Sequence, residues 1–319
     1  MRIQIWLAIA IALVLIGLII FAAVMASYGW DFTKLSTLKY ETNTYPISDA
    51  FSSISINTDT ADILFATAND EKCSVVCYET EKVKHTVTVQ GDILTIHLVD
   101  NRQWHEYIGI NFNSPKITVY LPQREYNMLS IKGSTGDVEI PQNFQCRTME
   151  ILMSTGDVLS SASASEDVKI KTTTGSIHIQ NISAAALDLT VSTGKVQVTN
   201  AICKGDLTVH VSTGKANLTN IQCLNLISKG NTGDISLKNV IATGNFSIER
   251  TTGDIQLNGS DAAAIRMNTD TGDIIGTLLS SKIFLASTET GHVDVPQTAT
   301  GGKCQIETST GNIKIDIVS

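Results

Sequence analysis

The chain has 319 residues and a formal net charge of −8, a length that allows one large or two ordinary domains with a substantial core. Lysine and arginine number 23 against 31 aspartates and glutamates, and no basic run occurs, so nucleic acid is not an expected partner. The six cysteines form no Cys-x-x-Cys pair, so no familiar zinc or redox motif is present.

The first segment is strongly apolar. From Ile3 to Ala26 it contains one polar side chain, Gln4, and about 20 apolar residues suffice to span a bilayer. The alternative is a cleavable signal peptide ending near Val24 and Ala26, although its apolar region normally has about 7 to 15 residues. We predict a single-pass anchor over residues 1–27 in the cytoplasmic membrane, with the bulk of the chain outside the cytoplasm.

Residues 28–48 show no clear period, and we predict a spacer there. Residues 49–128 resemble strands without a constant period. Within "SISINTDTADILF", Ile54 and Ile56 precede Ala61, and Ile63 and Phe65 follow it, in alternation. We therefore predict an irregular β region over 49–128 that covers the first coil of the repeats that follow.

A Thr-Gly pair recurs through the remainder of the chain. Its intervals are 19 or 20 residues, which is typical of stacked repeats. The glycines are Gly136, Gly156, Gly175, Gly194, Gly214, Gly233, Gly253, Gly272, Gly291 and Gly311. Apolar residues recur two after, five before and seven before each glycine, with polar residues between them, so both flanks are predicted strands. The fold class is all-β: a single-stranded β-solenoid, or parallel β-helix, of about ten coils over residues 129–319.

Asparagines support parallel stacking. Asn181, Asn200, Asn220 and Asn239 each lie six residues after a glycine of the repeat, and Asn258 lies five after. Identical amides can hydrogen-bond to one another between in-register parallel strands. The alternative, ten antiparallel hairpins, is less consistent with threonine before glycine, because two-residue hairpin loops prefer Asn-Gly or Asp-Gly.

A family resemblance rests on three stretches: "WHEYIGINFNSPKITVYLP", "LSIKGSTGDVEI" and the serial "STGD" or "STGK" turns. Over roughly residues 49–319 the chain resembles the bacterial putative-adhesin family, also called domain of unknown function 4097. The resemblance implies a β-solenoid, often membrane-anchored, on the outer side of the cytoplasmic membrane, and some relatives are associated with envelope-stress regulation. It supplies no catalytic residues.

The residue after each glycine is the main candidate for metal binding. Asp234, Asp254 and Asp273 would stack about 5 Å apart, and a calcium ion could relieve their repulsion. The competing interpretation is that these carboxylates bond the local backbone and close turns. A phosphate cradle is not expected, since no helix N-terminus follows the glycine. No cofactor is expected.

Cys203 and Cys223 both lie nine residues after a glycine, in adjacent predicted coils. Their Cα atoms would be about 4.8 Å apart, within the range that a disulfide tolerates. Alternatively they are small core residues, as Ala184 and Ala242 are in the same column.

The leading functional interpretation is a non-enzymatic, membrane-anchored binding module or envelope scaffold, of the adhesin or stress-related kind. One alternative is a carbohydrate-active β-helix enzyme, although the histidines share no phase and the constant spacing leaves no long loop to build a cleft. Another is a self-assembling module that pairs end to end through the last coil, with Lys314 and Asp316 as guards against pairing. Expected partners are the membrane and an envelope protein or polysaccharide.

Overall fold

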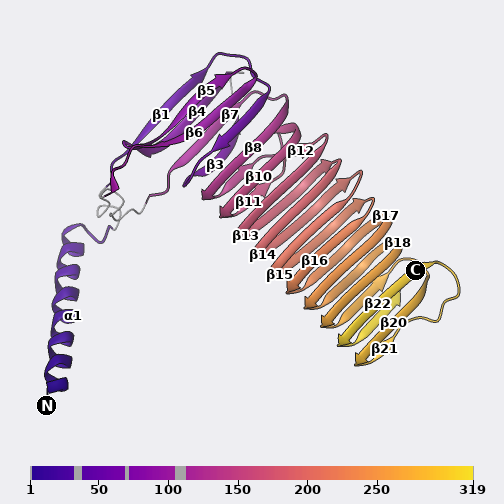
Figure 1. The fold of residues 1–319 in the computed structure, drawn as a ribbon. Helices are drawn as coiled ribbons and strands as arrows, with labels where there is room; N and C mark the ends of the chain where they lie inside the picture. The colour runs from indigo at the N-terminus through magenta and orange to yellow at the C-terminus, as the bar shows by residue number, and fades with distance from the viewer. Residues whose placement is uncertain (1, 32–37, 69–71, 105–112, 319) are drawn as a thin grey trace.

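The computed structural model describes residues 2–31, 38–68, 72–104 and 113–318. In these residues the chain forms one helix, α1 (Arg2–Ser27), and 23 strands that are hydrogen-bonded into one continuous sheet. Figure 1 shows the strands stacked as the rungs of a long solenoid, with the N-terminal strands at one end.

Helix α1 is the one helix in the described residues that is long and apolar enough to cross a membrane. Its apolar side chains are exposed along its whole length, from Ile5 to Val24, and only Met25 among those described is buried. A helix that is apolar on all sides lacks the polar face of a surface helix. It therefore suits a membrane anchor or a signal peptide.

The regular part of the solenoid begins at β8. Its strands are β8 (Glu125–Thr135), β9 (Val138–Ile140), β10 (Gln145–Thr155), β11 (Val158–Ser160), β12 (Ser163–Ala164), β13 (Asp167–Ala184), β14 (Ala186–Cys203), β15 (Leu207–Cys223), β16 (Leu226–Thr232), β17 (Ile235–Thr252), β18 (Ile255–Thr271) and β19 (Ile274–Leu278). Equivalent residues of successive coils pair in parallel, so Gly175 lies beside Gly194 and Gly194 beside Gly214. The predicted solenoid is confirmed and the hairpin alternative is wrong for these coils.

Each coil has an apolar interior that two corners shape. In the coil around Gly194 the buried side chains are those of Leu187, Leu189, Val191, Val196, Val198, Ala201 and Cys203. The alternation shifts by one residue at Asn200, whose φ is 54°. Asparagine tolerates this left-handed conformation better than most residues. The corner therefore lets the chain bend while both flanks still face the core.

The glycine corner leaves no room for a side chain. At Gly214 the backbone has φ 135°, and an added Cβ would lie 1.7 Å from the carbonyl oxygen of Gly194. The same crowding recurs from coil to coil. Glycine is required here because the backbones of neighbouring coils meet at positive φ.

The N-terminal region adds antiparallel strands to the solenoid. Its strands are β1 (Tyr40–Ile47), β2 (Ser53–Asn57), β3 (Asp62–Thr67), β4 (Cys73–Thr80), β5 (Val83–Gln90), β6 (Ile93–Asp100) and β7 (Lys116–Leu121). β1 pairs with β4, β4 with β7, and β5 with β6, all antiparallel. The spacer expected over 28–48 is therefore wrong for residues 40–47. Those residues form β1 because β4 offers a free edge and Tyr45 and Ile47 pack against the core.

The first coil is β2 with β3. Its Ala61 occupies the position of the repeat glycine, since an added Cβ on Gly136 would meet the Ala61 carbonyl oxygen. Ile54 pairs with Leu129, and Ile63 with Val138, which confirms the phase predicted around Ala61. On its other side this coil pairs in parallel with β6 and β7. The coil formed by residues 53–67 thus lies between strands that follow it in the sequence.

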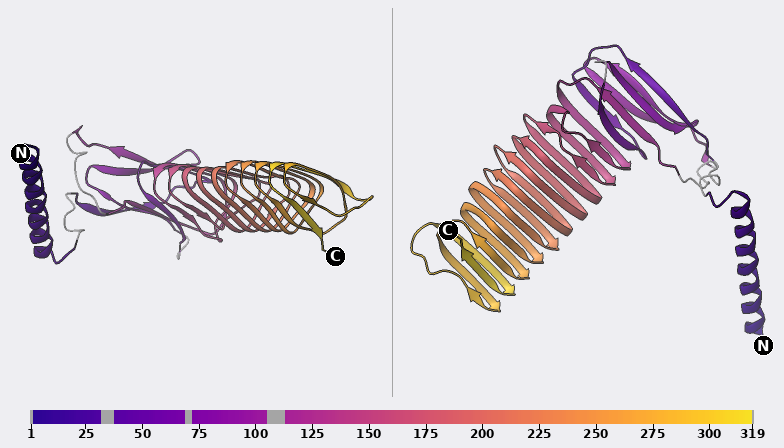
Figure 2. Two further views of the ribbon diagram at one scale, coloured as in Figure 1. Left: turned by 90° about the horizontal axis from the view of Figure 1, so that it is seen from below. Right: turned by 180° about the vertical axis from the view of Figure 1, so that it is seen from behind.

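The C-terminal coils are also out of sequence order. Their strands are β20 (Lys282–Thr290), β21 (Val293–Asp294), β22 (Gly302–Thr310) and β23 (Ile313–Ile317). β22 pairs with β18 on one side and β20 on the other, and β23 pairs with β19 and β21. Figures 1 and 2 show β20 and β21 at the far end of the stack.

The expectation that the last coil forms an open end is therefore wrong. Lys314 pairs with Ile275 on one side and Asp294 on the other, so it does not guard a free edge. The chain leaves one coil's width open, forms the outermost coil, and then returns to fill the gap. Two glycines permit this return: a Cβ on Gly301 would lie 1.8 Å from the Ser281 carbonyl oxygen, and one on Gly302 would lie 1.7 Å from that of Ala263.

Candidate functional site

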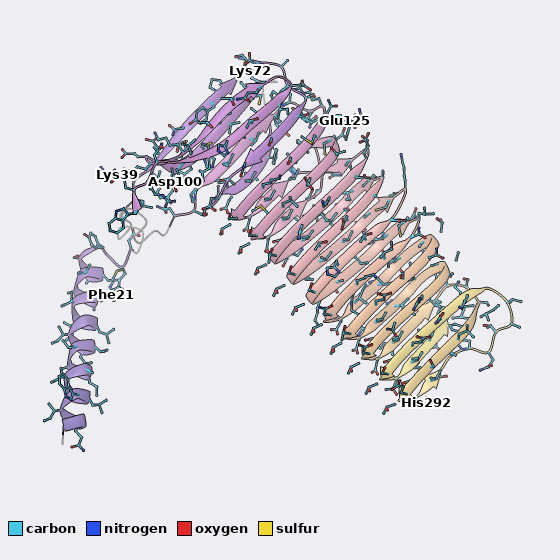
Figure 3. The ribbon with its side chains drawn as sticks, viewed as in Figure 1. Phe21, Lys39, Lys72, Asp100, Glu125 and His292 are labelled. Carbon is cyan, nitrogen blue, oxygen red and sulfur yellow. The ribbon has the colours of Figure 1, made fainter. Side chains whose placement is uncertain are left out.

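The asparagine corners form a continuous ladder on the solenoid surface. The Nδ2 of Asn200 donates to Oδ1 of Asn181 at 2.8 Å, and Asn220 donates to Asn200 at 2.9 Å. Asn239 extends the ladder by donating to Asn220 at 3.1 Å. The predicted ladder is confirmed for these four residues. Figure 3 shows how outward side chains repeat in rows along the solenoid in this way.

Asn258 does not join the ladder. The left-handed corner of its coil is Gly259, with φ 58°, and Asn258 lies one residue earlier on extended strand. A Cβ on Gly259 would lie 3.2 Å from Oδ1 of Asn239. The ladder ends there because glycine provides the bend but no amide.

A groove runs beside the ladder. It has a volume of about 570 Å³ and is lined by the four asparagines and by residues that follow them. Ile202 projects at its rim with 53% of its surface exposed, and Ser183 and Gln222 occupy the equivalent positions in neighbouring coils. Each coil thus offers one amide and one rim side chain, repeated at the strand spacing of about 4.8 Å. The surface suits an extended ligand that spans several coils.

The aspartates after the glycines bond the backbone of the next coil. Oδ1 of Asp234 accepts the Asp254 N–H at 3.2 Å, and Oδ1 of Asp254 accepts the Asp273 N–H at 2.9 Å. Asp273 accepts the Asn312 N–H at 2.6 Å, which agrees with the altered order of the last coils. Lys215 pairs with Asp234 at 2.9 Å, and that interaction, through its hydrogen bond, holds the pKa of Asp234 below its ordinary value. Among the described residues, Asp234, Asp254 and Asp273 do not form a cluster with metal-ligand spacing.

Threonines inside the coil brace the glycine corner. Thr172 donates to the Gly156 carbonyl oxygen at 3.3 Å, Thr269 to that of Gly253 at 3.0 Å, and Thr308 to that of Gly272 at 3.0 Å. Each of these three threonines begins a Thr-x-Thr stretch, faces inward and stabilises the turn.

Cys203 and Cys223 are buried free thiols in the structure. Both lie in the core column that also contains Ala184 and Ala242. Burial raises the pKa of Cys203 to about 11 and that of Cys223 to about 12. Their arrangement is that of small core residues, and the disulfide alternative is not realised in the structure.

Arg250 is a buried cation that the sequence reasoning missed. It is 4% exposed, and Gly230 in the preceding coil makes room for it, since a Cβ there would lie 2.7 Å from Nη1 of Arg250. Nη2 donates to Ser228 Oγ at 2.9 Å. Burial lowers the pKa of the guanidinium to about 10. The signal was present: Ser228 and Gly230 are small or polar residues in columns that are otherwise mostly larger, one coil before an inward arginine.

The Arg250 site opens onto a hollow of about 350 Å³ that contains charges of both signs. Lys229 pairs with Glu249 at 3.2 Å across it, and His210 and Asp270 lie at its edge. The hollow therefore has no net preference for an anion or a cation.

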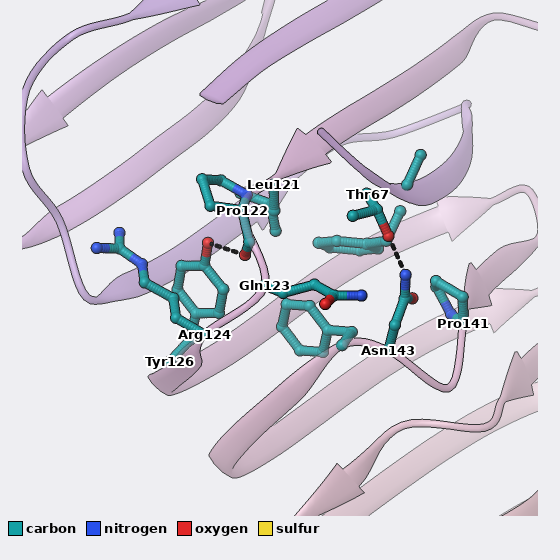
Figure 4. Close-up of a pocket in the computed structure, with 11 residues that line it drawn as sticks. Thr67, Leu121, Pro122, Gln123, Arg124, Tyr126, Pro141 and Asn143 are labelled. Atoms are coloured by element: carbon teal, nitrogen blue, oxygen red, sulfur yellow. Dashed lines mark hydrogen bonds between the residues drawn. The ribbon is translucent and has the colours of Figure 1, made fainter. Parts of the chain in front are cut away.

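An aromatic cluster fills the junction between the first coil and the N-terminal strands. Figure 4 shows Tyr126 with its hydroxyl donating to the Pro122 carbonyl oxygen, at 3.1 Å, and Asn143 donating to Thr67. The ring of Tyr126 stacks on that of Phe144 with centroids 5.5 Å apart, and Arg124 lies over Tyr126 at 4.8 Å. The remaining cavity is about 10 Å³, which is room for about one water molecule. The cluster is a structural plug with no space for a larger ligand.

The histidines do not gather at one place. His178 lies on β13 and His210 on β15, two strands that β14 separates. His292 lies at the far end of the solenoid, His85 is buried in the N-terminal region, and His97 is exposed on β6. His105 is outside the described residues. The described histidines therefore form no shared catalytic centre.

The chain is similar to one protein family and to several solved structures. The family model described as Toastrack DUF4097 matches residues 51–209 and 201–319. A crystal structure of a putative lipid binding protein from Parabacteroides distasonis is 19% identical, covers 76% of this chain and 98% of that one, and superposes with a TM-score of 0.53. Identity at this level supports a shared fold and nothing further.

Two further structures are described as putative adhesins. The one from Parabacteroides distasonis is 11% identical, with 86% of this chain and 98% of that chain covered and a TM-score of 0.49. The one from Bacteroides fragilis is 18% identical, with 87% and 97% covered and a TM-score of 0.42. No curated protein matches the chain.

Proposed function

The chain belongs to the Toastrack DUF4097 family, and we propose that it is a non-enzymatic, membrane-anchored module whose solenoid presents its ladder faces outside the cytoplasm. Helix α1 supports an anchor, because its apolar surface surrounds the whole helix. In this proposal the helix stays uncleaved and the solenoid lies on the outer side of the cytoplasmic membrane. Its role is adhesion, scaffolding or sensing in the envelope.

The groove beside the asparagine ladder carries the proposal. It repeats one amide and one rim side chain per coil over the four coils of Asn181 to Asn239. Asn200, Asn220 and Asn239 each use one N–H within the ladder and retain a second donor for a ligand, whereas Asn181 only accepts within the ladder. A polysaccharide strand or an extended segment of an envelope protein could engage several coils together. Weak contacts at several coils strengthen one another, because binding at one coil raises the effective concentration of the ligand at the next.

A pull-down with the full chain in detergent tests this proposal. Membrane and cell-wall fractions are passed over immobilised wild-type protein, an Ile202→Glu variant and a Leu159→Glu variant. Ile202 lies at the groove rim, whereas Leu159 is an exposed leucine, 38% accessible, outside the lining of the groove. We expect Ile202→Glu to lose the retained material and Leu159→Glu to keep it. Equal retention by both variants would contradict a role for the groove.

The enzymatic alternative has a separate test. A β-helix enzyme would release reducing ends or unsaturated sugars from a panel of polysaccharides, whereas a binding module would leave them intact. Polysaccharide degradation that co-purifies with the chain, and whose rate increases with the chain's concentration, would overturn the non-enzymatic proposal.

Self-association is a second candidate function, favoured by the outermost coil. Among the described residues no strand pairs with the outer edge of β20, and its Ile283 and Leu285 are 43% and 53% exposed. Unpaired strand edges can pair with another chain. We expect the full chain in detergent to form dimers by sedimentation velocity, and Leu285→Lys to shift them to monomers while Leu159→Lys does not. A wild-type monomer at all concentrations would rule this function out.

A further inference from the structure

Three potential metal ligands converge inside the N-terminal region. Cys77 and Glu79 lie on β4, and His85 lies on β5, and the short connection of residues 81–82 between the two strands brings them together. Cys77 and Glu79 are 0% exposed and His85 is 2% exposed. One thiol, one carboxylate and one imidazole atom lie within 4.8 Å of one another, and no other group in the described parts of the chain meets this spacing.

Neighbouring groups hold these ligands as the second shell of a metal site would. Nδ1 of His85 lies 2.8 Å from Oε2 of Glu79, and its Nε2 lies 2.9 Å from Oγ1 of Thr58. The other carboxylate oxygen, Oε1, accepts Nδ2 of Asn43 at 2.8 Å and lies 3.4 Å from the Tyr45 hydroxyl, which donates to the His85 carbonyl oxygen at 3.0 Å. A metal-ligating histidine commonly donates its second ring N–H to a fixed acceptor, which orients the ring. Thr58 is placed to be that acceptor.

The charge of the cluster also suits a divalent cation. Glu79 is fully buried, and the group that faces it as an ion-pair partner is His85. The nearby Lys84 is engaged at the surface, 2.6 Å from Glu41. A divalent cation bound by one thiolate, one carboxylate and one neutral imidazole gives a net charge of zero, which is the least costly state for a buried site.

We propose that Cys77, Glu79 and His85 form a structural binding site for a thiophilic divalent cation, with Zn²⁺ as the best match. Zinc combines cysteine, histidine and carboxylate ligands, whereas calcium and magnesium require six or more oxygen ligands or retained waters. On binding, the thiol releases its proton to solvent. The imidazole keeps one proton, on Nε2, and donates it to Thr58 while Nδ1 ligates the ion.

The fit requires the ligand atoms to move by up to about one ångström. Cys77 Sγ lies within 4.8 Å of the other two ligand atoms and must come to about 3.6 Å from each, given a zinc–sulfur bond of about 2.3 Å. Tetrahedral zinc, with bonds of about 2.0 to 2.1 Å to nitrogen and oxygen, places those two atoms about 3.3 Å apart. The 2.8 Å between His85 Nδ1 and Glu79 Oε2 must therefore widen by roughly half an ångström. Three protein ligands leave the fourth position for a water or a neighbouring hydroxyl.

The site would connect four segments of the N-terminal region. Its ligands come from β4 and β5, and its second shell comes from β1, through Asn43 and Tyr45, and from Thr58 after β2. Because β2 belongs to the first coil, the ion would fasten the antiparallel strands to the solenoid. We therefore expect zinc to stabilise the protein and to be taken up most readily during folding, since the ligands are buried.

Metal analysis of the full chain tests the proposal. The protein is unfolded with a chelator, refolded in detergent with Zn²⁺ or with Mg²⁺, desalted and analysed for metal. We expect about one zinc per chain, no retained magnesium and a higher thermal midpoint with zinc. Refolding with Co²⁺ should give a near-ultraviolet thiolate-to-cobalt absorption band.

Three variants make the test specific. Cys77→Ser should lose the zinc and the cobalt band, while Cys203→Ser, which removes another buried thiol, should keep both. Thr58→Val should weaken zinc affinity by about 10- to 100-fold, as loss of a second-shell partner does. Wild-type protein that retains no zinc and gives no cobalt band would overturn the proposal, and that result does not depend on whether a variant folds. Equal zinc retention by Cys77→Ser and Cys203→Ser would also overturn it.

Discussion

At the asparagine corner, substitution by glycine should destabilise the protein less than substitution by alanine, which is the reverse of the usual order in a strand. Asn220 has φ 54°, donates its amide to Asn200 and accepts from Asn239. Asn220→Ala removes both hydrogen bonds and places an ordinary L-residue in the left-handed region. Asn220→Gly removes the same bonds but accepts the backbone conformation, as Gly259 does two coils later at φ 58°.

The magnitudes follow from these losses. Two partly exposed hydrogen bonds contribute about 0.5 kcal/mol each, at the low end of the usual range. The left-handed conformation costs an ordinary residue about 1 to 2 kcal/mol. The alanine variant should therefore lose about 2 to 3 kcal/mol of unfolding free energy. The glycine variant loses the hydrogen bonds and about 0.5 to 1 kcal/mol of backbone entropy, or about 1.5 to 2 kcal/mol in all.

Guanidinium unfolding of the full chain in detergent, followed by circular dichroism, measures this order. Thr219 supplies the control, because it precedes Asn220 on extended strand in the same coil. At Thr219 the alanine variant should be the more stable of the pair, since glycine is unfavourable in a strand. If Asn220→Ala proves as stable as Asn220→Gly, the left-handed corner does not determine the effect and the reasoning is refuted.

Three further predictions follow from the corners and the coil order. Gly214→Ala should abolish folding or cost more than about 4 kcal/mol, because its Cβ would lie 1.7 Å from a neighbouring carbonyl oxygen. Gly205→Ala, whose Cβ would lie 3.1 Å from the Ala185 carbonyl oxygen, should cost much less in the same thermal melt. Deletion of residues 302–318 should make the backbone amides of β20 exchange rapidly with deuterium, because β20 pairs only with β22 in the described residues. Slow exchange of the β20 amides in the deletion variant would contradict the coil order. Lys215→Met should raise the depressed pKa of Asp234. A depressed carboxyl pKa stabilises the folded protein above the unfolded pKa, and this stability is lost as pH falls through the folded pKa. The variant should therefore lose less unfolding free energy than wild type between about pH 4 and pH 3, and an unchanged pH dependence would refute the ion pair's role.

The sequence was sufficient to predict the regular coils. A period of 19 or 20 residues with alternating apolar positions on both sides of glycine leaves few folds other than a solenoid. The Asn ladder followed from the same periodicity. The phase of Ala61 matched that of the repeat glycines, but the structure was needed to show that residues 53–67 are themselves the first coil. These features are local and repeated, so each copy confirmed the others.

The order of the coils could not be read from the period. Every coil presents nearly the same edges, so a coil can pair in register with the next coil in the chain or with a later one. The return at the C-terminal end also needs space: Gly301 and Gly302 let the chain pass close to Ser281 and Ala263.

The two buried polar sites required three-dimensional information for different reasons. Arg250 depends on Gly230 and Ser228 in the coil before it, a compensation that becomes visible only when coils are aligned by column. The Cys77 cluster lies where the period is lost, and its spacing matches no familiar zinc motif. Only the short connection between β4 and β5 brings His85 to Glu79.

The central claim is that an anchored chain displays its solenoid outside the cytoplasm, and cysteine accessibility tests it most directly. All six native cysteines are buried, so wild-type protein should react little with a membrane-impermeant maleimide. Thr213→Cys places one thiol at an exposed turn. The account predicts that membrane-bound Thr213→Cys protein, in cells stripped of their outer layers, is labelled without permeabilisation. Labelling only after the membrane is permeabilised, or recovery of the chain without its first 27 residues, would contradict it.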